Sequence, residues 1–154
     1  MSQTKIEWCD RSWNVISGCT PISEGCQNCY AKKMANRLKG RYGYPEDEPF
    51  RVTFHPDRLD EPLFWKKSCR IFVCSMGDIF HENIKPEWID VVWETMAASA
   101  CHQHTFIVLT KRPQNIDRLL YGVTEECSCR ELGGGDYLSN LWLGVSVENQ
   151  RTAD

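Results

Sequence analysis

The chain has 154 residues, of which 42% are hydrophobic and 25% are charged, and its formal net charge is -3. This length and balance are typical of one globular domain with its own core, without low-complexity tracts or internal repeats. The slightly negative net charge argues against a protein that binds nucleic acid over its whole surface. It does not exclude a local basic patch that binds nucleic acid.

The N-terminus carries no apolar run flanked by basic residues, and no stretch approaches the ~18 apolar residues of a membrane span. We therefore expect a cytoplasmic protein without a membrane partner. The cytosol keeps thiols reduced, so the nine cysteines are not expected to form disulfides, and their odd number would leave one unpaired. Metal binding becomes the favoured explanation for any tight cluster of cysteines.

Five short apolar runs, taken in chain order, are typical of β-strands. Several are nearly continuous in valine, isoleucine, phenylalanine and leucine, which predicts strands buried on both faces, as in a parallel sheet. The runs are WNVI (13–16), FRVTF (50–54), RIFVCSM (70–76), TFIVLT (105–110) and LWLGVSV (141–147).

Helical patterns lie between these runs. Tyr30, Met34 and Leu38 share one face of the first, and Pro86 suits the first turn of a helix with apolar residues at core spacing. The predicted helices cover residues 30–38, 57–67, 86–100 and 113–121. The alternation of strands and helices predicts an α/β fold with a mostly parallel sheet and right-handed crossovers.

Residues 122–140 interrupt this alternation and predict a surface insertion within a single domain spanning 1–154. Cys127 and Cys129 form a C-x-C pair there, which raises the possibility of a second metal site. The final residues, ENQRTAD, begin a further helical pattern. A five-unit sheet that stopped at this point would leave an open edge, so we expect the chain to be truncated at its C-terminus.

Three cysteines share one loop with the spacing Cys19-x6-Cys26-x2-Cys29. Three thiolates can hold three irons of a [4Fe–4S] cluster and leave the fourth iron open to a substrate or cofactor. Zinc is an alternative, and a closed structural zinc site would need a fourth ligand. Three unligated thiols are the remaining interpretation.

The stretch IEWCDRSWNVISGCTPISEGCQNCYAKKMANRL resembles the opening of a phage- and prophage-borne family of largely uncharacterised proteins. The segments RVTFHPDRL, FVCSMGDIFHENI, VLTKRP and WLGVSVENQ extend the resemblance over most of the chain. That family is similar to radical S-adenosylmethionine (SAM) enzymes, especially the branch that resembles spore photoproduct lyase.

The resemblance implies a partial (β/α) barrel with the cluster on the loop after the first strand. Cys19, Cys26 and Cys29 would be the metal ligands, and the open iron would bind the amino and carboxylate groups of SAM. Reductive cleavage of SAM would give methionine and a 5′-deoxyadenosyl radical that abstracts hydrogen from an unknown substrate. The six-residue first gap departs from the C-x3-C-x2-C spacing that is common in these enzymes.

Further candidate SAM contacts lie where ligands gather in α/β folds, at the carboxyl ends of strands. Each has a plainer interpretation as a turn, capping or solvated residue. Tyr30 follows the third cysteine, whereas the family often has an aromatic residue before it, where Asn28 stands. The candidates are Tyr30, Gly77, Asp78, Lys111, Ser146, Glu148 and Asn149.

The sequence thus predicts a radical SAM-like iron–sulfur protein, either an enzyme or a fragment of one. The resemblance implies an electron donor such as a flavodoxin or ferredoxin. The basic residues between Lys32 and Arg41 leave nucleic acid as one candidate substrate class, although the solvated face of a helix is the favoured explanation for them. The rival hypothesis is a non-catalytic zinc-stabilised module that binds nucleic acid or a phage partner.

Overall fold

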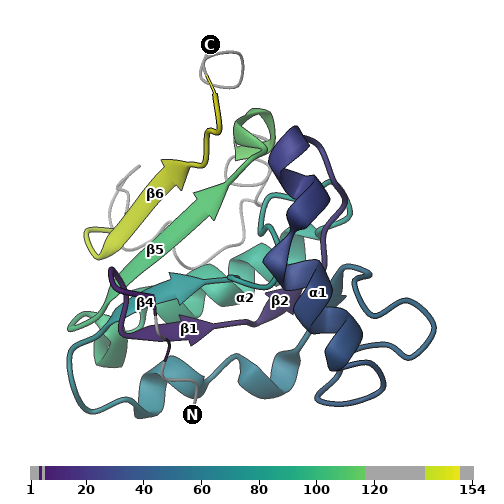
Figure 1. Cartoon of the computed structure of the whole chain (residues 1–154). Helices are drawn as coiled ribbons and strands as arrows, with labels where there is room; N and C mark the ends of the chain where they lie inside the picture. The colour runs from purple at the N-terminus through teal and green to yellow at the C-terminus, as the bar shows by residue number, and fades with distance from the viewer. Residues whose placement is uncertain (1–3, 5, 117–137, 150–154) are drawn as a thin grey trace.

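The computed structural model describes residues 4, 6–116 and 138–149 as a mixed α/β fold around one parallel sheet (Figure 1). The sheet order is β1 (Arg11–Trp13), β4 (Arg70–Val73), β5 (Thr105–Thr110) and β6 (Leu141–Val145). Every neighbouring pair in this order is parallel. The predicted α/β class with a mostly parallel sheet is therefore confirmed, and the described strands form an open sheet without closing a barrel.

One face of this sheet is covered by helix α2 (Pro86–Ala97), which lies behind the strands in Figure 1. Ile89, Val92 and Met96 are fully buried at helical spacing and belong to the same core cluster as Phe106 of β5. Proline in the first turn suits a helix start, because the first amides have no intrahelical acceptor. The helix predicted from Pro86 is thus confirmed, and a short turn, η4 (Ser99–Cys101), follows it.

Strand β6 differs from the prediction that the apolar runs are buried on both faces. Trp142 is 64% exposed and Val145 is 45% exposed. Among the described strands, β6 is paired on one side alone, with β5. An edge strand lacks the second neighbour that would cover its side chains, so apolar content alone overestimates its burial.

The run 50–54 was also expected in the parallel sheet, and this prediction is wrong. Its last two residues form β3 (Thr53–Phe54), which pairs antiparallel with β2 (Ile16–Ser17) in a separate sheet of two strands. Helix α1 (Tyr30–Arg37) lies beside β2, beyond the end of β1 (Figure 1). After α1 the chain therefore turns back, and β3 runs alongside β2 in the opposite direction.

The helix predicted over 57–67 is replaced by two short 3-10 helices, η2 (Pro56–Arg58) and η3 (Glu61–Phe64). Proline within this stretch, at Pro62, supplies no amide hydrogen for a continuous α-helix. The helix predicted over 113–121 begins with a 3-10 turn, η5 (Pro113–Asn115). No helix in the described part of the chain has the length and apolar character needed to cross a bilayer.

Several predictions fall outside the described residues. They concern residues 117–121 of the fourth predicted helix, most of the predicted insertion, the pair Cys127 and Cys129, and residues 150–154. The end of the predicted insertion is described, and Leu138 packs against the main core there. Asn140 donates hydrogen bonds of 3.2 Å to the carbonyls of Met96 and Cys101, which ties the entry of β6 to the end of α2.

Candidate functional site

The three cysteines lie on one loop, which runs from the end of β2 through the 3-10 helix η1 (Glu24–Asn28) to α1. Cys19, Cys26 and Cys29 are all partly exposed free thiols. The amide of Cys29 donates to the carbonyl of Cys26 at 3.2 Å and closes the turn that separates them. The loop therefore presents the thiols beyond the carboxyl ends of the strands, where the sequence predicted a ligand site.

Two glycines bring this loop against the end of β4. Gly18 and Gly77 form a parallel bridge, and the Gly18 amide donates to the carbonyl of Met76 at 2.9 Å. A Cβ atom on Gly77 would lie 2.8 Å from the Gly18 carbonyl oxygen. Gly77 therefore has room for backbone alone, and its close neighbour in this structure is the cysteine loop.

Arg112 is the main link between the loop and the sheet. It follows β5 and is 1% exposed. One terminal nitrogen donates to the sulfur of Cys19 at 3.1 Å, and the other donates to the carbonyl and hydroxyl oxygens of Thr20 at 2.9 and 3.0 Å. Its Nε donates to both carboxylate oxygens of Glu82 at 2.9 and 3.0 Å.

Asp78 completes this network from the turn after β4. Its carboxylate accepts the Thr110 hydroxyl at 2.8 Å and the amides of Phe80 and Lys111 at 3.0 and 3.1 Å. It also pairs with Arg112 at 3.4 Å. Asp78 is buried, and its carboxylate accepts hydrogen bonds from four protein groups. It therefore joins the ends of β4 and β5.

A second anchor holds the other end of the loop. The carboxylate of Glu148 accepts the Gly25 amide at 2.8 Å and the Ser23 hydroxyl at 3.0 Å. Lys111 forms an ion pair with Glu148, and its Nζ lies 3.3 Å from the Ser23 hydroxyl. Lys111 and Glu148, which the sequence singled out, thus meet at the loop from the ends of β5 and β6.

The surroundings of the thiols affect their ionisation differently. Burial raises the pKa of Cys19 above its usual value, although the guanidinium of Arg112 acts in the opposite direction. Burial also acts to raise the pKa of Cys26, but the Ser23 hydroxyl, two backbone groups and Lys111 outweigh it and lower that pKa. Nearby cations and hydrogen-bond donors of this kind favour the thiolate, which is the form that binds metals.

The three thiols suit a metal or cluster in donor type and number, and the two cations beside them are each paired with carboxylates. Three thiols on one loop, with cations at Lys111 and Arg112, form a suitable set for an anionic thiolate site. Within the described ranges, however, no group of three cysteine, histidine or carboxylate side chains converges on a point that could hold a metal ion. Cys19 is engaged by Arg112, and Cys26 by the Ser23 hydroxyl at 3.3 Å.

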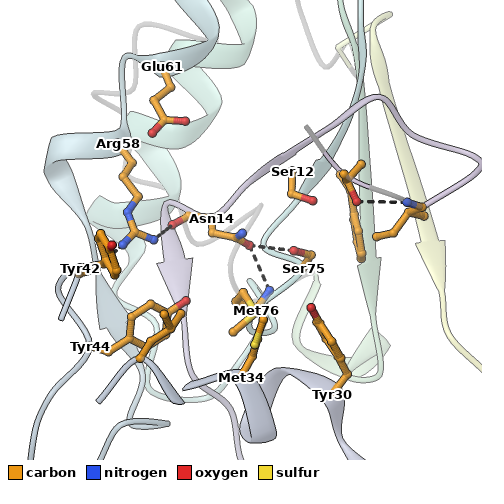
Figure 2. A pocket seen from close by; sticks show the side chains of 14 residues that line it. Ser12, Asn14, Tyr30, Met34, Tyr42, Tyr44, Arg58, Glu61, Ser75 and Met76 are labelled. Atoms are coloured by element: carbon orange, nitrogen blue, oxygen red, sulfur yellow. Dashed lines mark hydrogen bonds between the residues drawn. The ribbon is translucent and has the colours of Figure 1, made fainter. Parts of the chain in front are cut away.

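A cavity of about 840 Å³ opens beside the start of α1 (Figure 2). Asn14 lines this cavity, and its side-chain oxygen accepts the Ser75 hydroxyl and the Met76 amide, each at 3.0 Å. Arg58 lines another wall and donates to the carbonyls of Asn14, at 3.0 Å, and Tyr42. Aromatic and apolar walls with a few fixed polar groups are typical of a small-molecule site.

The remaining predicted SAM contacts are placed apart from one another. Tyr30 lines the cavity and is 68% exposed. Ser146 donates its amide to the carbonyl of Thr110 at 2.8 Å and so extends the sheet beyond β6. Asn149 is an exposed residue beyond it.

Sequence reasoning missed several residues of the site. Arg112, Thr20 and Ser23 hold the cysteine loop, and His81 contacts the Thr20 hydroxyl at 2.9 Å. In the cavity it missed a further set, namely Asn14, Arg58, Ser75 and Met76. Of all these, Arg112 had a usable signal, because a second cation directly follows Lys111 at the end of a strongly apolar strand.

The chain matches a known protein family over almost its whole length. The family model described as "Protein of unknown function (DUF5131)" matches residues 3–154. No curated protein and no solved structure matches the chain significantly. The description of the family carries no activity, so the function must be inferred from the site.

Proposed function

The chain belongs to the DUF5131 family of proteins of unknown function, and we propose that it is a radical SAM-like iron–sulfur protein. Cys19, Cys26 and Cys29 would hold a [4Fe–4S] cluster through three of its irons. Such a cluster, when bound and reduced, supplies the electron that cleaves SAM to methionine and a 5′-deoxyadenosyl radical.

The observation that carries this proposal is the position and charge of the cysteine loop. Its three thiols lie beyond the carboxyl ends of parallel strands, and the buried guanidinium of Arg112 donates to one of them at 3.1 Å. Lys111 contributes to lowering the pKa of Cys26. Hydrogen bonds from a guanidinium and a nearby ammonium group stabilise thiolates, and here both cations are held in place by carboxylates, namely Glu148 for Lys111 and Asp78 and Glu82 for Arg112.

The neighbouring cavity supports a small-molecule partner for this site. Its volume of about 840 Å³ lies within the range of about 300–1,000 Å³ that ligand pockets usually have. Tyr30 comes directly after Cys29 and lines the cavity, so the cysteine loop continues directly into the wall of the cavity. We propose that SAM lies here, with Tyr30 and the polar groups of Asn14 and Ser75 facing it.

The wider parts of the proposal follow from the same family resemblance. The four parallel strands would be part of a radical SAM-type partial barrel in a cytoplasmic protein of phage or prophage origin. An electron donor such as a flavodoxin or ferredoxin would reduce the cluster. The substrate is open, and nucleic acid is one class to test, since Lys32, Lys33 and Arg37 are exposed on α1.

The test is anaerobic reconstitution with iron and sulfide, followed by metal analysis and absorption spectroscopy. We expect about four irons per chain and a broad charge-transfer band near ~400 nm. Cys26→Ala should lose the band. Cys9→Ala is the matched control, because Cys9 is a buried thiol outside the loop and should leave the band intact.

Two results would overturn this proposal. Stoichiometric zinc with no band near ~400 nm would favour a zinc-stabilised module, which should also unfold on chelation because metal binding then contributes to folding. An equal band in wild type and Cys26→Ala would show that the loop is not the site. Reductive cleavage of SAM by the reconstituted protein is then measured as the second step.

A further inference from the structure

Arg112 stands out because it is a fully buried cation at the edge of the proposed cluster site. Its guanidinium reaches four other residues, and each of its three nitrogens has at least one partner. These partners are Cys19, Thr20, Asp78 and Glu82. A buried charge is costly unless it is paired and hydrogen-bonded, so a fold that keeps one here holds it in a defined place.

The contacts of Arg112 are of two kinds: some hold its guanidinium in place, and the others connect it to the cysteine loop. Glu82 binds its Nε side with two contacts of 2.9 and 3.0 Å, and Asp78 lies 3.4 Å from its first terminal nitrogen. Both carboxylates come from the segment after β4, so they fix the guanidinium relative to the sheet. Its other contacts reach Cys19 and Thr20 across the gap to the loop.

The contact with Cys19 has a length and charge that affect the sulfur directly. The distance of 3.1 Å is short for a donor to sulfur, and the donor is a permanent cation. Hydrogen bonds to cluster sulfurs and the net charge nearby are among the factors that set the reduction potential of a cluster. A donor fixed at this place would stabilise the more negative, reduced state.

Resting on the proposed function, we propose that Arg112 is the positioning residue of the cluster site. It would fix Cys19, the first ligand, at the carboxyl ends of β4 and β5, and would keep a charge-assisted hydrogen bond on that sulfur. The planar guanidinium suits this role, because one group reaches Glu82, Cys19 and Thr20 in different directions. A lysine carries the same charge but lacks this rigid fork.

The experiment compares reconstituted wild type with Arg112→Gln and Arg112→Lys. Iron content and the midpoint potential of the bound cluster are measured in an anaerobic redox titration. Arg70→Gln is the matched control, since it removes the same charge at the opposite end of β4, where Arg70 pairs with Asp10 on the surface. Circular dichroism checks that each variant is folded.

We expect Arg112→Gln to bind less than half the iron of wild type. Its remaining cluster should show a tenfold shift of the reduction equilibrium against the reduced state, which is about 59 mV for one electron. Arg112→Lys should recover much of the potential, because it keeps the charge, and little of the iron content. Arg70→Gln should match wild type in both measurements.

Wild-type iron content and potential in Arg112→Gln would overturn the role of Arg112 while the proposed function stands. Absence of a cluster from the wild type would overturn both. If Arg112→Gln does not fold, Glu82→Ala decides, because the Glu82 side chain is 51% exposed and its truncation removes one anchor of the guanidinium but leaves the guanidinium itself. Lower iron than Arg70→Gln then supports the role, and equal iron overturns it.

Discussion

At the scale of single residues, Gly18 decides how the cysteine loop meets the rest of the fold. Its φ of +90° lies in a region that other residues rarely adopt, and a Cβ atom would lie 2.2 Å from the carbonyl oxygen of Arg51. The same residue bridges to Gly77 on its other side. The loop thus leaves β2 through a gap that has room for backbone alone.

This close packing predicts a difference between two glycines that share a positive φ. Gly40→Ala meets no atom nearer than 3.8 Å and should cost about 1–2 kcal/mol in the free energy of unfolding, from its backbone conformation. Gly18→Ala should cost ~1–3 kcal/mol more, because the added methyl group overlaps the backbone of Arg51. Urea unfolding of both variants measures the difference, and equal losses would contradict the crowding at Gly18.

At the scale of secondary structure elements, adjacent strands of similar composition have different environments. In β5, Phe106 is fully buried and packs against Trp13 at a ring distance of 5.8 Å. In β6, Trp142 pairs in register with Ile107 and stays 64% exposed. The sheet position, rather than the residue type, therefore determines what each strand contributes to stability.

Truncation of one aromatic residue in each strand checks this contrast. Phe106→Ala should lower the free energy of unfolding by about 3–5 kcal/mol, because it removes a buried ring and leaves a cavity. Trp142→Ala should cost less than about 1 kcal/mol, because most of that side chain already contacts water. Chemical denaturation followed by circular dichroism gives both values, and a large loss for Trp142→Ala would mean that β6 is covered in solution.

At the scale of the whole molecule, buried histidines link stability to pH. Burial lowers the pKa of His55 from its ordinary 6.5 to about 4, and Arg58 acts in the same direction. Burial also lowers the pKa of His104. Both side chains are almost completely buried, and the ring of His55 lies 2.7 Å from the Ser17 hydroxyl. The native state therefore favours their neutral forms.

We expect the free energy of unfolding to fall as the pH drops from about 6.5 to 4. In that window the unfolded chain takes up a proton at His55 that the folded chain does not, which costs about 3 kcal/mol in total. Above pH 6.5 this contribution is absent, since both states are neutral. His55→Gln should reduce the slope of stability against pH in urea titrations, and an unchanged slope would contradict the assignment.

Local patterns were sufficient to predict the elements that depend on neighbours in sequence. The strand at 105–110 and the helix from Pro86 were predicted because apolar spacing and an N-terminal proline act within one element. The grouping of Cys19, Cys26 and Cys29 on one loop is likewise visible in the sequence. The family resemblance, and not the alternation of strands and helices, implied their place on the loop after the first predicted strand.

Contacts between distant segments were decided by the tertiary structure alone. Residues 53–54 pair antiparallel with β2 because α1 returns the chain from the far end of β1, and no local pattern encodes that direction. Arg112 reaches Cys19 across 93 positions, and Glu148 reaches Gly25 across 123. Such pairs form because packing of the sheet brings strand ends together, which fixes the side chains around the cysteine loop independently of their separation in the sequence.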